Sequence, residues 1–137
     1  MENTLQELSQ LATLAGLLGG FGFTAIIQLL SMERKGKLVT ATILIFSLAT
    51  LMFLLALLMF ILTFSAIVEL NALPESLMSL GTYGLLIALI AVFVLEAGIG
   101  LAGWIRSKAA GLVTTILAAV SICLTGVVVA SVISHFA

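Results

Sequence analysis

The chain has 137 residues, of which 63% are hydrophobic and 8% are charged, and its formal net charge is −1. Soluble domains carry roughly 25% charged residues, so a water-soluble core of this composition would leave large apolar surfaces in water. The composition therefore excludes a soluble globular domain and predicts an all-α integral membrane protein.

Four apolar runs are each long enough to cross a bilayer, which takes about 20 residues of helix. They cover residues 8–30, 38–67, 80–104 and 109–134. The first and third connections are short, which favours antiparallel neighbours. We therefore expect a four-helix transmembrane bundle made of two antiparallel hairpins, with residues 1–137 as a single transmembrane domain.

The first run is rich in glycine. Thr4 and Glu7 ahead of it have the spacing of a capping box, which predicts a helix that starts near the membrane surface. Small and polar residues then recur every fourth position, and small residues let transmembrane helices approach closely. We expect this row to pack against another helix of the chain, or to form a subunit–subunit or pore-lining face: Ala12, Gly16, Gly20, Thr24 and Gln28.

The basic residues are confined to two connections. Arg34, Lys35 and Lys37 lie in the first, and Arg106 and Lys108 lie in the third. Cytoplasmic loops carry an excess of Lys and Arg. This distribution predicts that both basic loops are cytoplasmic and that both termini are on the non-cytoplasmic side.

The second run, 38–67, is bulky nearly all round, so we expect it to face lipid on the outside of the bundle, while the other three spans pack more intimately. It is also longer than the hydrocarbon core requires, which predicts tilting or projection beyond the membrane. Pro74 should break the helix after this span. Ser76 or Ser79 is then expected to cap the third span.

Glu96 is the residue that most resembles a functional site. It precedes Arg106 by ten residues, or about 15 Å of helix, which predicts a position near mid-membrane. An ionisable residue at that depth is a functional-site hypothesis by default, and the sequence places no Lys or Arg at the same depth. Three interpretations are open: a neutral carboxyl bonded to a hydroxyl or carbonyl, a proton or cation site, and a contact to a different subunit. Gly100, one turn further on, would allow a close approach.

The fourth run carries a second stripe of small residues, and its hydroxyls need no special role because they can bond to the preceding turn. Trp104, next to the basic turn, is expected to anchor the interface. The small stripe consists of Thr115, Ala119, Cys123, Gly126 and Ala130.

Several chemistries have no support in the sequence. A single cysteine excludes an internal disulfide, and a single histidine leaves no zinc-ligand spacing. No glycine-rich phosphate loop follows a strand, and no nucleophile has a base partner. We therefore expect no enzymatic activity, no cofactor, no metal and no nucleic-acid binding.

Two functional hypotheses follow. In the first, the chain forms a homo-oligomeric channel or transporter for protons, ions or a small solute, with Glu96 as the intramembrane site. In the second, it is a non-catalytic accessory or assembly subunit of a larger membrane complex. In size and number of spans the chain is similar to the small multidrug resistance transporters, which use one membrane-embedded glutamate. Their glutamate lies in the first span and Glu96 lies in the third, so the similarity is one of mechanism and not of family.

Overall fold

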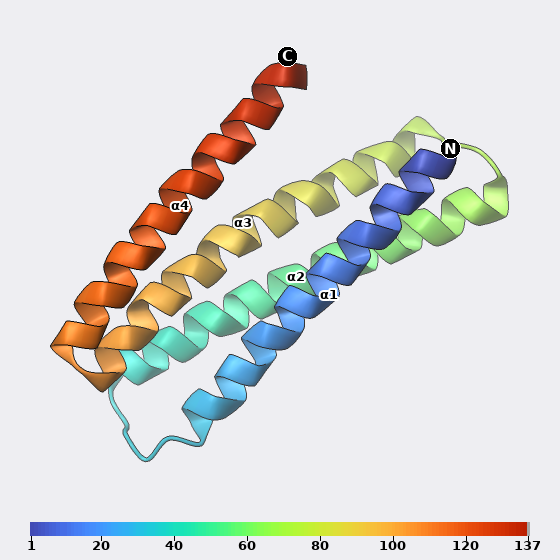
Figure 1. Cartoon of the computed structure of the whole chain (residues 1–137). Coiled ribbons are helices and arrows are strands. Elements are labelled where there is room, and N and C mark those ends of the chain that lie inside the picture. Colours follow the sequence, from blue (N-terminus) through green and yellow to red (C-terminus); the bar gives the residue numbers. More distant parts are fainter. Residues whose placement is uncertain (137) are drawn as a thin grey trace.

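Residues 1–136, which the computed structural model describes, form four long helices joined by short connections (Figure 1). Each helix is long and apolar enough to cross a membrane, consistent with a multi-pass membrane protein. The expected spans are confirmed as helices, and the helices extend beyond them at nearly every end. They are α1 (Glu2–Leu30), α2 (Lys37–Leu70), α3 (Glu75–Arg106) and α4 (Lys108–Phe136).

The connection between α2 and α3 is a sharp stop in the helical backbone. Asn71 adopts the left-handed conformation, with φ 48° and ψ 37°, as is common after the last helical residue. Pro74 then stands at the N-cap position of α3 in an extended conformation. Its ring cannot continue a helix that arrives from α2, so the predicted break at this residue is confirmed.

Two expected caps are wrong. Met1 occupies the N-cap position of α1, which places Thr4 inside the first turns of the helix and not at its start. Ser76 and Ser79 also lie within α3, where the Ser79 hydroxyl donates to the Ser76 carbonyl oxygen at 2.8 Å. Both helices therefore start earlier than their apolar runs, because polar residues at a helix end do not prevent the backbone from forming helical hydrogen bonds.

The helices form an open row and do not close into a bundle. Along residues 1–136, α2 packs against α1 and α3, α3 also packs against α4, and α1 touches α3 only slightly. α4 contacts α3 alone and diverges from it toward the C-terminus (Figure 1). Both termini lie at the end of the molecule opposite the two basic connections. The two expected antiparallel hairpins are present, but the fourth helix is an arm on the side of a three-helix core.

The expectation that the second span lies on the outside is wrong, because α2 is the central helix. Its aromatic and small side chains alternate at helical spacing, and Phe53 and Phe60 are almost fully buried. Glycines on both neighbours make room for these rings. A Cβ added to Gly19 of α1 would lie 3.4 Å from the Phe53 Cβ, and one added to Gly84 of α3 would lie 3.0 Å from the Phe60 Cε1.

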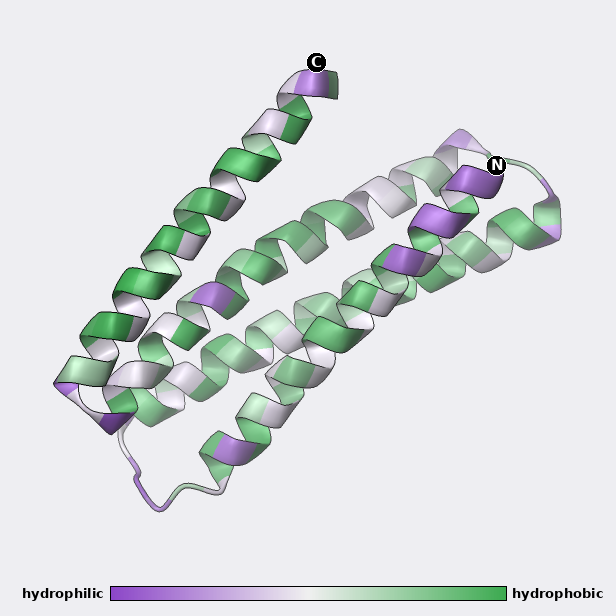
Figure 2. Cartoon of the chain, in the orientation of Figure 1, coloured by the Kyte–Doolittle hydropathy of each residue, from purple (hydrophilic) through white to green (hydrophobic). Residues whose placement is uncertain are grey.

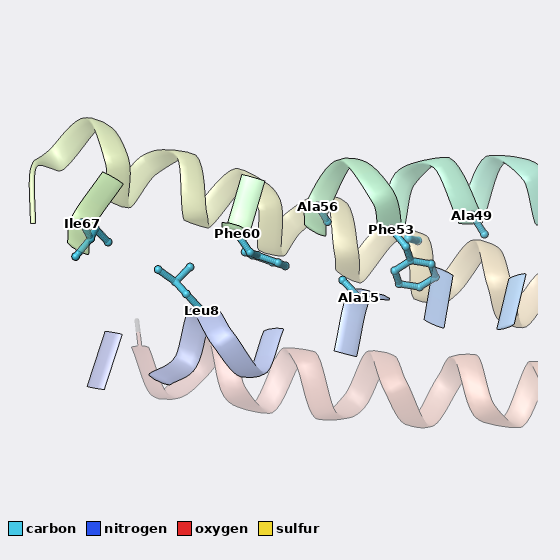
Figure 3. Packing of buried hydrophobic residues seen from close by; sticks show 8 residues of the cluster. Leu8, Ala15, Ala49, Phe53, Ala56, Phe60 and Ile67 are labelled. Atoms are coloured by element: carbon cyan, nitrogen blue, oxygen red, sulfur yellow. The ribbon is translucent and has the colours of Figure 1, made fainter. Parts of the chain in front are cut away.

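The core between these helices is mainly apolar, with buried threonines of α2 whose hydroxyls bond to their own helix. Figure 3 shows Leu8 and Ala15 of α1 facing the buried side chains of α2. The phenylalanines and alanines of the α2 core therefore pack against helices on two sides, while many of its leucines stay exposed. The buried cluster comprises Leu8, Ala15, Ala49, Phe53, Ala56, Phe60, Ile67 and Ala91.

Hydrophilic residues gather at the ends of the molecule (Figure 2). At one end, Arg34 of the first basic connection bonds to the end of α3, next to the second. The Arg34 guanidinium donates to the carbonyl oxygen of Ile105 at 2.5 Å and to that of Arg106 at 3.5 Å. These carbonyls are at the C-terminus of α3, where no further helical turn can satisfy them. A cation at that position also interacts favourably with the helix dipole.

We expect Arg34→Gln to loosen this end of the molecule without unfolding it. The loss of a cation from an exposed helix C-terminus costs about 0.3–1 kcal/mol. Hydrogen exchange should therefore become faster in residues 31–37 and in the last turn of α3. Lys35→Gln removes a charge from the adjacent position and is the matched control. Equal exchange rates in Arg34→Gln and the wild type would contradict the role of this contact.

Candidate functional site

The candidate site lies between α3 and α4, and a one-residue turn creates it. Ser107 separates the two helices in an extended conformation, with φ −166° and ψ 165°. Its hydroxyl accepts a hydrogen bond from the backbone N–H of Ala110 at 3.1 Å, which caps the start of α4. Because the turn is so short, the chain reverses at once, and α4 returns along α3.

Glycines hold α3 and α4 close together near this turn. A Cβ added to Gly100 would lie 2.9 Å from the Ala118 Cβ, and the Trp104 ring covers the Cα of Gly111. The Thr114 hydroxyl donates to the Gly100 carbonyl oxygen at 2.9 Å. The close approach that glycine allows therefore brings hydroxyls of α4 within bonding distance of α3.

Glu96 lies one turn beyond Gly100 in the same contact and is half-buried. Its Oε1 accepts hydrogen bonds from the hydroxyls of Ser121, at 2.6 Å, and Thr125, at 3.0 Å. Its Oε2 is buried and has no hydrogen-bond partner among residues 1–136. A pocket of about 170 Å³ opens beside the carboxyl, lined also by Ile99 and Leu117. The two oxygens of the carboxyl group therefore differ: Oε1 accepts two hydrogen bonds, and Oε2 accepts none.

The hydroxyls that meet Glu96 differ from the other hydroxyls in the helices. In α1, α2 and the first half of α3, threonine side chains donate to the carbonyl four residues earlier in the same helix; they include Thr24, Thr42, Thr50, Thr63 and Thr82. Ser121 and Thr125 instead reach across to another helix. The expectation that these two hydroxyls bond to the preceding turn of their own helix is therefore wrong.

The register of the hairpin is the signal that could have identified these partners. Glu96 precedes the turn residue Ser107 by eleven positions, and Ser121 follows it by fourteen. Residues at similar distances from a tight turn lie at similar depth in an antiparallel pair. Ser121 and Thr125 are also spaced by four, which puts both on one face of α4.

A third hydrogen bond between side chains of α3 and α4, besides the two to Glu96, is nearer the turn. The Trp104 Nε1 donates to the Thr115 hydroxyl at 2.7 Å, while the ring is about one-third exposed. Together with the bonds to Glu96 and Gly100, it makes the contact between α3 and α4 polar, whereas aromatic and aliphatic side chains fill the contacts of α2. Polar bonds can break and reform with little repacking, so the two kinds of contact differ in how readily they can open.

The glycine row of α1 lies elsewhere. Gly16 is half-buried near Leu57, while Gly20, Thr24 and Gln28 are exposed. A Cβ on Gly20 would have no atom within 4 Å. The face of α1 that packs against α2 is the adjacent row, which contains Ala15, Gly19 and Gly22. The first half of the expected row, at Ala12 and Gly16, therefore packs in part against the rest of the chain, whereas its second half, at Gly20, Thr24 and Gln28, is left uncovered. The row lies on α1, and the hydroxyls that bond to Glu96 lie on α4.

No basic residue of the sequence lies near Glu96 along the helices. Every Lys and Arg of the chain lies in the two connections or at the helix ends beside them, so hydroxyl groups are the polar neighbours of the carboxyl. Carboxylate and hydroxyl oxygens bind protons and hard cations. In residues 1–136, no three His, Cys, Asp or Glu side chains are close enough to hold a metal ion. Comparison with protein-family models, curated proteins and solved structures found no match to this chain.

Proposed function

We propose that the chain is a subunit of a homo-oligomeric membrane channel or transporter, in which Glu96 binds the proton or cation that crosses the membrane. The observation that carries this proposal is the state of the carboxyl: Oε1 accepts two hydroxyl hydrogen bonds, and the buried Oε2 has no partner. A buried polar atom without a partner is costly. A cation would give Oε2 a partner, and a proton would remove the negative charge that is buried there, which makes this oxygen a natural binding position.

The hydroxyls provide a means to couple binding to movement. When Glu96 is neutral, its oxygens are weaker acceptors, since bonds to an ionised acceptor are roughly twice as strong as neutral ones. Ser121 and Thr125 can then turn back to the carbonyls of their own helix, as the other threonines do. α4 would lose two of the bonds that hold it to α3 and could swing outward.

Two features of the chain support an oligomer: its small size and an exposed row of small and polar residues on α1. An open row of four helices is too small to surround a pathway, but several copies can do so. The exposed row at Gly20, Thr24 and Gln28 supports a contact between copies, because small residues allow helices to approach closely in lipid. We further propose that the two basic connections face the cytoplasm, which puts both termini on the other side.

Flux through proteoliposomes tests this function. Purified protein is reconstituted, and entry of protons, sodium and potassium is followed with ion-sensitive dyes after a gradient is imposed. The proposal requires flux of at least one of these ions above that of protein-free vesicles, and its loss when Glu96 is replaced with Gln.

The alternative is an accessory subunit of a larger membrane complex. One observation favours it: α4 contacts only α3, and most of its surface is exposed and apolar. That surface would then dock onto a different polypeptide, whose basic residue would pair with Glu96. This alternative predicts no flux by the isolated chain and a stable complex with other proteins in the native membrane.

A further inference from the structure

One end of the molecule is strongly basic. The five Lys and Arg residues of the chain are all exposed there, with Glu33 as their one acidic neighbour in the same connections: Arg34, Lys35, Lys37, Arg106 and Lys108. At the opposite end, the connection between α2 and α3 and the start of α1 carry only acidic charges among their side chains: Glu2, Glu7, Glu69 and Glu75. The chain therefore has a marked charge asymmetry along its long axis.

The fold gathers the basic residues from two distant parts of the sequence. The hydrogen bonds from Arg34 to Ile105 and Arg106 hold the first connection against the end of α3. The turn at Ser107 is one residue long, so Lys108 stays beside Arg106. The two groups of cations consequently lie at the same end of the molecule, as Figure 1 shows for the two connections.

Two helices begin and two helices end at the same place. α2 begins at Lys37 after Gly36 and has no side-chain cap, and α4 begins nearby at Lys108. The N-terminus of a helix carries a partial positive charge and free N–H groups. The C-termini of α1 and α3 lie at the same end and carry the opposite partial charge, and the Arg34 guanidinium donates to two carbonyls of α3. The helix ends therefore largely offset one another, and the five cationic side chains, against Glu33 alone, make this end favourable for an anion.

We infer that the basic end binds the headgroups of anionic phospholipids. The basic residues stand where the apolar faces of four helices end, and that is the level of the lipid phosphates. Clusters of Lys and Arg beside transmembrane helices attract anionic lipids. A phospholipid also fits the adjacent surface, because its acyl chains can cover exposed apolar residues such as Leu30 and Leu112. This inference does not depend on the proposed transport function.

The sole tryptophan of the chain provides a direct probe. Trp104 is two residues from Arg106 and about one-third exposed, so lipid at the basic end can quench its fluorescence. The full-length protein is reconstituted in phosphatidylcholine vesicles that contain either brominated phosphatidylcholine or brominated phosphatidylglycerol at equal mole fraction. We expect stronger quenching by the brominated phosphatidylglycerol. Equal quenching by the two lipids would overturn the inference.

Variants distinguish the effect of the positive charges from any effect of a disturbed fold. The triple change Lys35→Gln, Lys37→Gln and Lys108→Gln should abolish the preference for phosphatidylglycerol, whereas the same positions changed to Arg should keep it. Glu69→Gln together with Glu75→Gln, at the opposite end, should also keep it. A preference that survives the Lys→Gln changes would contradict the inference. The inference would also be contradicted if the preference for phosphatidylglycerol disappeared in phosphate buffer but not in chloride buffer of equal ionic strength. That result would show that the basic end binds a soluble anion.

Discussion

Glu96→Gln is expected to reduce ion flux through proteoliposomes to the level of protein-free vesicles. The amide has nearly the same shape as the carboxyl, and its oxygen can still accept from Ser121 and Thr125. What it lacks is the ability to bind and release a proton or to carry the negative charge that holds a cation. The variant therefore removes the proposed chemistry and fixes the contact between α3 and α4 in the weaker form proposed for the neutral carboxyl.

Two further variants make this result interpretable. Glu96→Asp keeps a carboxyl group but withdraws it by one methylene, so flux should be reduced and still measurable. Glu69→Gln, outside the apolar part of α2, should leave flux unchanged. Size-exclusion profiles and helical circular dichroism should match the wild type for all three variants. Wild-type flux in a correctly assembled Glu96→Gln protein would rule out Glu96 as the transport site.

Gly103→Leu is expected to separate α4 from α3. A Cβ on Gly103 would lie 2.7 Å from the backbone carbonyl oxygen of Ala110 and would also collide with the Thr114 side chain. A backbone atom cannot rotate out of the way, so the whole helix must move. Overpacking of this kind costs typically about 1–3 kcal/mol. The bonds from Thr114 to Gly100 and from the α4 hydroxyls to Glu96 should then be lost.

Spin-label distances measure this separation. One label is placed on the native Cys123 of α4, which is exposed, and the second on an introduced cysteine at Tyr83 of α3, also exposed. Dilution with unlabelled protein removes distances between copies. Gly103→Leu should lengthen and broaden the distance distribution. Gly126→Leu is the matched control, since a Cβ there meets no atom within 4 Å. Identical distributions in the Gly103→Leu protein and the wild type would show that close packing at Gly103 does not hold the arm.

The sequence predicted the four helices because hydropathy identifies which segments can leave water. It did not predict their arrangement, since a bulky apolar side chain can pack equally well against lipid or against another helix. Phe53 and Phe60 look lipid-facing in the sequence of α2, yet both are almost fully buried. They pack against Gly19 and Gly84 in other helices, and the sequence of one helix does not indicate which residues of other helices it contacts.

The candidate site was predictable in part for related reasons. Glu96 stands out because a carboxyl in an apolar span is costly. Its partners do not stand out, because any serine or threonine in a helix can bond to its own backbone. Two neighbouring rows of α1 are both rich in small residues, and only the structure distinguishes the row that packs, at Ala15 and Gly19, from the exposed row at Gly20.

Native mass spectrometry of the protein gently extracted from its own membrane tests the central claim most directly. A homo-oligomeric channel or transporter predicts a single assembly whose mass is a fixed multiple of the 14.3 kDa chain. Gly20→Leu, on the exposed row of α1, should shift that assembly toward the single chain. A stable mass shared with other polypeptides, or a single chain alone, would contradict the claim, and the former result would identify an accessory subunit.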